Sequence, residues 1–362
     1  MARANEFYRG RRKGLRPLTV CVIVAVVLIL ALALVLQYFE RFLVYTPDGV
    51  SLELPFLSGE AADVTADAGP QRVDGTVVFD APSFEDVQQR DVSGLAAIHA
   101  LYVPIDEVSD VGLTLASGNL AGIGADALLL QMKDASGRLA WASTVKEAVS
   151  YGASSAYDPT QSLAALRERG VYLAAEVCCC TDALMAERNL PLALKNADGA
   201  AYADAAGVWL DPLNGEVRNY LAALCRELAE MGFDEIVLTG LAFPENAADV
   251  RFSQALSSTP DAASAVSALA SRLTAALADT GVRVSAECPV SAVLSGTPAA
   301  SGQDPKLFFK LFDRVYAYTS GQAPQCYSAV AAYPIAGEAS VRFVFLSAYG
   351  LTEGSWVCTP ER

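Results

Sequence analysis

From residue 96 onward, short apolar stretches typical of β-strands alternate with longer amphipathic stretches typical of α-helices. The apolar stretches predict seven strands, at residues 97–104, 127–132, 171–178, 235–239, 282–287, 314–318 and 341–347, and residues 356–358 add a short eighth. Helices are predicted between them at residues 161–169, 215–231, 262–279 and 305–312. Apolar strands that alternate with amphipathic helices indicate a parallel sheet with helices on its outer face.

Seven or eight such strand–helix units fit a (β/α)8 barrel of the TIM type. A doubly wound sheet is the main alternative, but no Gly-x-Gly-x-x-Gly motif follows the first predicted strand. The chain ends soon after residues 356–358, which leaves no room for a final helix of ordinary length. We therefore expect a barrel that is either incomplete at its C-terminal end or closed by the N-terminal hairpin described below.

A different hydrophobic pattern occurs near the N-terminus. Residues 18–36 are all apolar except Thr19, and about 20 apolar residues are enough for a helix to span a bilayer. Residues 1–16 carry six basic side chains and one acidic one. The positive-inside rule then places residues 1–16 in the cytoplasm and residues 40–362 outside the cell membrane. A cleavable signal peptide ending near Ala33 is the alternative, but the apolar stretch continues beyond that point.

These patterns divide the chain into a basic cytoplasmic arm (1–16), a transmembrane signal-anchor helix (17–38), a stalk (39–95) and the barrel (96–362). Within the stalk, Pro47, Asp48 and Gly49 separate two apolar stretches and predict a β-hairpin. Residues 57–93 are rich in Asp, Gly, Ala and Ser, which is typical of a linker. We predict a single-pass membrane protein whose barrel is extracytoplasmic.

Composition and charge exclude several functions. The 362 residues include 53% hydrophobic side chains and carry a net charge of −15, which argues against nucleic acid as a partner. His99 is the single histidine, so a zinc site with several histidines is excluded and a Ser-His-Asp triad is disfavoured. We expect no cofactor and no metal.

The cysteines allow three interpretations. Cys178, Cys179 and Cys180 end one predicted strand, and Cys288 ends another. They are small buried side chains, disulfide partners of Cys326 and Cys358 in an exported domain, or ligands of a soft metal. The absence of a Cys-x-x-Cys pair among them favours the first interpretation.

In a (β/α)8 barrel the chemistry lies at the C-terminal ends of the strands. The polar and aromatic residues at or beyond the predicted strand ends are Lys133, Asp134, Glu176, Asp182, Trp209, Asp211, Glu245, Glu287 and Tyr318.

Several segments, in order, resemble the bacterial "putative glycosyl hydrolase domain" family of (β/α)8 barrels. They are Lys133-Asp134 with Gly137, Gly170–Tyr172, Asp182, Asn196–Gly199, Trp209–Pro212 with Glu216–Arg218 and Tyr220, Gly232–Ile236, Phe243-Pro244 and Val284–Ala286. The resemblance extends from about Leu101 to Tyr318. It implies a barrel fold and a carbohydrate ligand.

The chain also departs from the family pattern. Where the family has acids on the second and fourth strands, this chain has Gln131 and Thr239, and where it has arginines, this chain has Glu176 and Ala242. Glu287 replaces an Asp on the fifth strand. Glycosidic cleavage needs one protonated and one ionised carboxyl group, which Gln and Thr cannot supply.

The first functional expectation is therefore a membrane-anchored protein that binds a cell-envelope carbohydrate with impaired or absent catalysis. The alternatives are an active glycosidase with Glu287 and Glu176 as a rearranged catalytic pair, and a non-catalytic envelope scaffold. The substrate-binding candidates are Lys133, Asp134, Asp182, Trp209, Asp211, Glu245 and Tyr318. The expected partners are a polysaccharide and, through residues 18–36, the lipid bilayer.

Overall fold

The computed structural model describes residues 43–46, 49–52, 82–246, 249–253, 260–319, 321–351 and 353–359. The chain forms two compact units, Met1–Val73 and Asp74–Arg362. In the first unit, β1 (Leu43–Thr46) and β2 (Gly49–Leu52) form an antiparallel hairpin in which Thr46 pairs with Gly49, so the predicted hairpin is confirmed. The predicted membrane helix lies outside the described residues. No helix within them is long and apolar enough to cross a bilayer.

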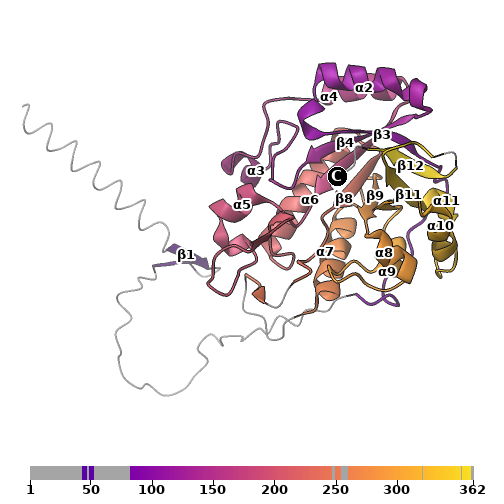
Figure 1. Ribbon diagram of the computed structural model, residues 1–362. Helices are drawn as coiled ribbons and strands as arrows, with labels where there is room; N and C mark the ends of the chain where they lie inside the picture. The colour runs from indigo at the N-terminus through magenta and orange to yellow at the C-terminus, as the bar shows by residue number, and fades with distance from the viewer. Residues whose placement is uncertain are drawn as a thin grey trace, which may run out of the picture. The chain divides into compact units, whose positions relative to one another are not determined.

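The second unit contains a closed barrel of parallel strands surrounded by helices (Figure 1). Its strands are β3 (His99–Val103), β4 (Ala127–Lys133), β5 (Tyr172–Cys178), β8 (Glu235–Thr239), β9 (Arg283–Glu287), β10 (Val315–Tyr318), β11 (Phe343–Ser347) and β12 (Ser355–Cys358). Each strand pairs with the next in this order, and β12 pairs with β3. All eight predicted strands are confirmed.

The expectation of an incomplete barrel, or of closure by the N-terminal hairpin, was wrong. The short strand β12 closes the barrel itself, because Trp356 pairs with His99 and Cys358 pairs with Leu101. The rings of His99 and Trp356 also stack across this seam, with centroids 5.3 Å apart. Closure of the barrel needs only a strand and does not depend on a helix after β12.

The longer helices between the strands are α2 (Asp110–Ile123), α4 (Thr160–Glu168), α6 (Gly215–Glu230), α7 (Ala262–Ala276), α9 (Pro305–Leu311) and α10 (Ala323–Ala331). The shorter ones are α3 (Lys146–Ser150), α5 (Ala183–Arg188), α8 (Val290–Ser295) and α11 (Ala339–Arg342). Two 3-10 turns, η1 (Ile105–Glu107) and η2 (Leu190–Leu192), and a small hairpin of β6 (Ala203–Asp204) and β7 (Gly207–Val208) lie in the loops. The four predicted helices correspond to α4, α6, α7 and α9.

Alternate residues along each strand belong to two separate cores. Leu128, Leu130 and Leu173 pack outward against the helices. Leu129 and Ala174 belong to a smaller cluster that fills the barrel interior. This period of two is expected for strands that are buried on both faces.

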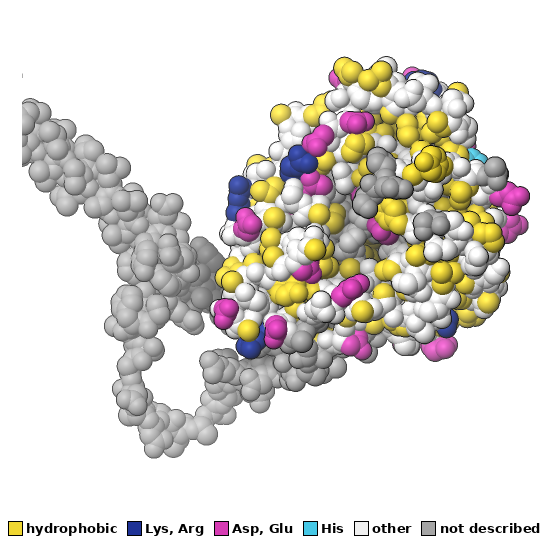
Figure 2. Space-filling model, in the orientation of Figure 1, with side chains coloured by type: hydrophobic (Ala, Val, Ile, Leu, Met, Phe, Trp, Pro, Cys, Tyr) yellow, Lys and Arg dark blue, Asp and Glu magenta, His cyan; other side chains and the backbone are white. Residues whose placement is uncertain are grey.

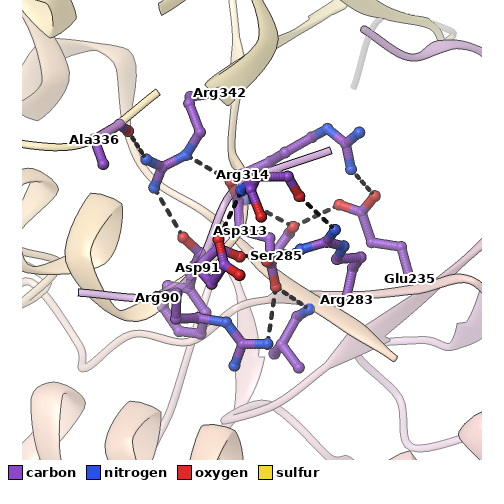
Figure 3. A network of polar contacts seen from close by, with 12 residues as sticks. Arg90, Asp91, Glu235, Arg283, Ser285, Asp313, Arg314, Ala336 and Arg342 are labelled. Carbon is purple, nitrogen blue, oxygen red and sulfur yellow. Dashed lines mark hydrogen bonds and ion pairs between the residues drawn. The ribbon is translucent and has the colours of Figure 1, made fainter. Parts of the chain in front are cut away.

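The chain before β3 packs against the barrel unit at the N-terminal ends of its strands. The guanidinium of Arg90 lies 3.0 Å from the carboxylate of Asp313, and the side-chain amide of Gln89 donates to the carbonyl of Phe309. Figure 3 shows Arg90, Arg283 and Arg342 gathered around Asp313 and its neighbours. The barrel unit therefore includes residues that composition alone had assigned to the linker.

Candidate active site

The strand registers sort the inward-facing side chains of the barrel into layers. Gln131 pairs with Glu176, Glu176 with Val237, and Val237 with Ser285 on successive strands β4, β5, β8 and β9. In a barrel of this type the strands tilt by about 36°, and each step to the next strand shifts the level by about one residue. Strand β9 lies two strands beyond β5, so the level shifts by two residues. Ser285 is in register with Glu176, and the residue of β9 at the same level as Glu176 is therefore Glu287, two positions further along.

The same rule defines two layers at the C-terminal ends of the strands. We call Tyr102, Glu176, Glu287 and Leu346 the acid layer, and Gln131, Thr239, Tyr318 and Thr359, one residue above it, the mouth layer. The four members of each layer come from alternate strands, as expected for the interior of a TIM-type barrel. The structure thus brings together the two candidate catalytic acids, Glu176 and Glu287.

The two acids differ in their access to solvent. The side chain of Glu176 is buried, whereas Glu287 is half-buried. Gln131 lies beside Glu176, with its amide nitrogen 3.5 Å from a carboxyl oxygen of Glu176. The amide oxygen of Gln131 accepts a hydrogen bond from the backbone of Ile105, at 3.1 Å. Gln131 is therefore oriented so that its donor group faces the acid layer.

A second polar cluster, the lower network, lies deeper in the barrel near the N-terminal ends of the strands. Glu235 is fully buried and pairs with Arg314, at 2.5 Å. Its two carboxyl oxygens also accept hydrogen bonds from the hydroxyls of Tyr172, Ser285 and Tyr316. Figure 3 shows Arg314, Ser285 and Glu235 directed toward one another. Every donor around Glu235 is thus supplied by the protein, so we assign this network a structural role.

Lys133 and Asp182 form another fully buried pair. Their charged groups are 3.0 Å apart, and the ammonium of Lys133 also donates to the carbonyls of Cys178 and Thr181. Burial alone would lower the pKa of Lys133, but the carboxylate of Asp182 holds it above its ordinary value. Asp182 also caps helix α5 by accepting from the backbone of Met185. Because neither side chain is exposed, the structure gives this pair a structural setting.

Asp134 and Asp211 hold loops in place. The carboxylate of Asp134 accepts from Ser136 and Arg138 within its own loop. Asp211 is fully buried, and its carboxylate accepts from the backbone of Leu213 and from the backbone and hydroxyl of Ser253. It therefore ties the segment after β5 to the segment after β8.

The remaining candidates lie in three different settings. Trp209 is buried, and its backbone pairs with that of Thr181. Glu245 is exposed in the loop after β8. Tyr318 is half-buried in the mouth layer, so it shares the barrel interior with the two acids.

The sequence interpretation missed two aromatic residues at this end of the barrel. Tyr102 lies in the acid layer, and its position on the inward face of the predicted strand 97–104 was the available signal. Tyr349 follows β11, and 78% of its side chain is exposed. No pattern in the sequence distinguished Tyr349 from an ordinary loop residue.

Cys178, Cys179, Cys180 and Cys288 have free thiols, as do Cys326 and Cys358, so the disulfide alternative is wrong for these residues. Burial raises the pKa of the Cys180 thiol to about 12 and of the Cys326 thiol to about 11. Within the described residues, no group of three or more His, Cys, Asp or Glu side chains is arranged to hold a metal ion. The interpretation of buried small side chains is confirmed for the three consecutive cysteines.

Two of the cavities in the described part of the chain lie at opposite ends of the barrel. One of about 600 Å³ is lined by Arg167, Tyr172 and Arg314 at the N-terminal ends of the strands. The other, of about 330 Å³, is lined by Ile105, Arg138 and loop residues at the C-terminal ends of β3 and β4. The second cavity adjoins the mouth layer, because Ile105 contacts Gln131.

Comparison with known proteins places the chain in a family. The model of the family described as "Putative glycosyl hydrolase domain" matches residues 118–323, which is more than half of the chain. The chain belongs to this family. The resemblance stated from the sequence motifs is therefore confirmed. No protein of curated function matches the chain.

The solved structures that are similar to this chain include the following three. A hypothetical protein from Ruminiclostridium thermocellum is 24% identical, with 51% of this chain and 96% of that chain covered and a TM-score of 0.43. The glycoside hydrolase domain of PgaB (BpsB) from Bordetella bronchiseptica is 12% identical, with 73% and 94% covered and a TM-score of 0.47. Ega3 of Aspergillus fumigatus, in complex with galactosamine, is 8% identical, with 72% and 80% covered and a TM-score of 0.43.

Proposed function

We propose that this protein hydrolyses glycosidic bonds of a cell-envelope polysaccharide, with Glu176 and Glu287 as its carboxyl pair. The observation that supports the proposal is that the strand registers place both acids in one layer at the C-terminal end of the barrel. Membership of a glycosyl hydrolase family supports a carbohydrate as the substrate. This placement favours the active glycosidase over the impaired one expected first from the sequence.

The spacing of the pair suits this chemistry. Neighbouring strands lie about 4.8 Å apart, and Glu287 lies two residues beyond the register partner of Glu176, so the backbones of these two residues are on the order of 10 Å apart. The two side chains converge toward the barrel axis, which brings the carboxyl groups closer than the backbones. Glycosidases operate with carboxyl groups roughly 5–9.5 Å apart, the shorter separations retaining and the longer ones inverting the anomeric configuration.

The location of the enzyme is part of the same proposal. Residues 18–36 anchor the chain in the cell membrane, and the basic residues 1–16 keep the N-terminus in the cytoplasm. The barrel then faces the cell envelope, where its polysaccharide substrate lies.

The test uses the full-length protein in detergent and a panel of bacterial envelope polysaccharides. We expect release of new reducing ends, and we expect it to fall about 10²–10⁴-fold in Glu287→Gln and in Glu176→Gln, because each removes one acid–base group. The matched control is Glu230→Gln, an exposed acid at the C-terminal end of α6. Release that is equal in wild type and both active-site variants would exclude this carboxyl pair.

A glycan-binding protein without catalysis is the second candidate. Gln131 and Thr239 favour it, because both occupy positions where the family resemblance implies acids. Binding of a polysaccharide without any release of reducing ends is its expected signature. Absence of both binding and release is the result expected of a non-catalytic envelope scaffold.

A further inference from the structure

Helix α2 presents an apolar stripe to solvent. The side chains of Val111 and Leu115 are 70% and 64% exposed, and the exposed residues Gly118 and Gly122 continue the same line. Spacings of four, three and four residues keep all four on one face of a helix. In Figure 1, α2 lies at the outer edge of the barrel unit beside α4, and Figure 2 shows hydrophobic side chains exposed along that edge. We call these four residues the α2 stripe.

The fold accounts for two of the four glycines of α2 and its C-cap. Gly124 ends the helix in the left-handed conformation, with φ of 70°, and a Cβ atom at Gly112 would collide with the carbonyl oxygen of Glu107. A Cβ atom at Gly118 or Gly122 would instead meet only open space among the described residues. Apart from proline, glycine is the least favourable residue in a helix interior. Packing within one copy of the chain therefore gives no reason for these two glycines.

The stripe is also free of charge. Asp110 is the only charged residue of α2, and its carboxylate accepts hydrogen bonds from the hydroxyls of Tyr157 and Ser162. The chain as a whole carries a net charge of −15, so two copies repel each other over most of their surface. An uncharged, apolar stripe is a place where two copies can approach with little repulsion, and it offers no counter-charge to a strongly charged partner.

We propose that the α2 stripe is the interface of a symmetric homodimer in which the two copies of α2 pack antiparallel. The two-fold axis passes the helix midway between residues 116 and 117. Val111 and Gly122 are equally far from this midpoint along the chain, and so are Leu115 and Gly118. Each large side chain of one copy therefore lies over a glycine of the other copy, and the two helix backbones can approach closely.

The size of the contact sets the strength of the dimer. A helix of 14 residues is about 21 Å long, so two such helices bury less than the roughly 800 Å² per partner of a standard interface. We therefore expect a weak dimer that depends on protein concentration. The membrane anchor proposed for residues 18–36 would raise the local concentration of α2 and favour the dimer.

The test is sedimentation equilibrium of the full-length protein in detergent over a wide range of protein concentration. We expect an equilibrium between monomer and dimer. Val111→Lys should raise the dissociation constant at least about tenfold, because it places an unpaired charge in an apolar contact. The matched control is Val149→Lys, the same change at a valine of α3 that is 58% exposed. It should leave the dissociation constant within about twofold of wild type.

A second variant separates the interface from the stability of the helix. Gly118→Ala combined with Gly122→Ala should raise the melting temperature of the monomer, because alanine favours the helix and has room there. The same variant should raise the dissociation constant of the dimer at least about fivefold, because the methyl groups hold the two helices apart. A role confined to one copy of the chain predicts no change in the dissociation constant.

Thiol crosslinking tests the orientation of the two helices. A mixture of Val111→Cys and Gly122→Cys should crosslink with a short bismaleimide, whereas either variant alone should crosslink no more than wild type. Three outcomes overturn the inference. The protein may be monomeric at every concentration. A dimer may be unchanged in Val111→Lys, which indicates a contact elsewhere, such as residues 18–36. Gly122→Cys alone may crosslink as efficiently as the mixture, which contradicts antiparallel packing.

Discussion

The interior of this barrel contains carboxyl groups at two levels, and the side chains that surround these groups differ between the levels. In the lower network, Glu235 contacts an arginine and three hydroxyl donors, which come from β5, β9, β10 and the residue before β10. In the acid layer, Glu176 and Glu287 share a level with Tyr102 and Leu346. The same fold thus surrounds one buried acid with an arginine and three hydroxyls, and it places two other acids together in one layer.

We associate the lower network with the stability of the fold and the acid layer with function. A buried charge costs several kcal/mol unless it is paired and hydrogen-bonded, so a compensated acid contributes to a unique fold. Two acids in one layer repel each other when both are ionised, and such an arrangement is typical of a functional site. The comparison predicts opposite responses to the same Glu→Gln change at the two levels.

The largest effect is expected for Glu235→Gln. It leaves the buried guanidinium of Arg314 without its counter-charge, and breaking such a pair costs about 3–5 kcal/mol. The free energy of unfolding from urea titration is the measurement. A double variant, Glu235→Leu with Arg314→Met, removes both charges and should recover a large part of the loss. An unchanged stability in Glu235→Gln would contradict the structural assignment of the lower network.

A similar effect, on the order of 3 kcal/mol, is expected for Asp182→Asn, because Lys133 would remain charged and buried. Glycan affinity of the folded variant should stay within about twofold of wild type, since neither side chain is exposed. Urea titration and calorimetry measure the two quantities on the same preparation. A loss of affinity at unchanged stability would instead support the original expectation of a binding role for this pair.

A smaller, pH-dependent effect is expected at Glu227 on α6. Burial alone would raise the pKa of Glu227, but hydrogen bonds from Ser143, Thr144 and Trp141 lower it overall. These contacts stabilise the fold when Glu227 is ionised. Glu227→Gln should therefore lose about 1 kcal/mol or less at pH 7. The difference from wild type should disappear as the pH falls below the ordinary carboxyl range through the lowered pKa of Glu227. A difference that does not vary with pH would show that packing rather than charge is responsible.

The smallest effect on stability is expected for Glu287→Gln, and its sign distinguishes the two levels. Removing one charge from a layer that holds two acids relieves repulsion between like charges, so it should change the free energy of unfolding by less than about 0.5 kcal/mol or increase it, as is common at functional sites. Thermal and urea unfolding of the variant are the measurements. A destabilisation comparable to that of Glu235→Gln would show that Glu287 is structural.

The sequence predicted the barrel strands because both faces of each strand are buried. Segments such as 127–132 and 235–239 are short, apolar and bounded by turn residues, and their burial leaves little ambiguity. Helix α2 was not among the predicted elements. Its outward face carries Val111 and Leu115, which are 70% and 64% exposed, so the apolar positions do not form a clear helical stripe.

The candidate site was predicted only in part. Placing the residues at strand ends identified Glu176, Glu287 and Tyr318 correctly as residues of one end of the barrel. The same reasoning grouped them with Lys133, Asp182 and Asp211, which the structure buries in contacts with other parts of the chain. Position along a strand says which end a residue occupies, but not whether a neighbouring loop covers it.

The sequence by itself determined the strand–helix alternation, the family and the net charge, because each depends on local pattern or on composition. Only the tertiary structure decided that β12 closes the barrel and that Glu176 and Glu287 share a layer. It also decided that Glu235 is compensated by Arg314, 79 residues further along the chain. Register, shear and burial arise from pairing between distant segments, and no local pattern in the chain records which distant residues will meet.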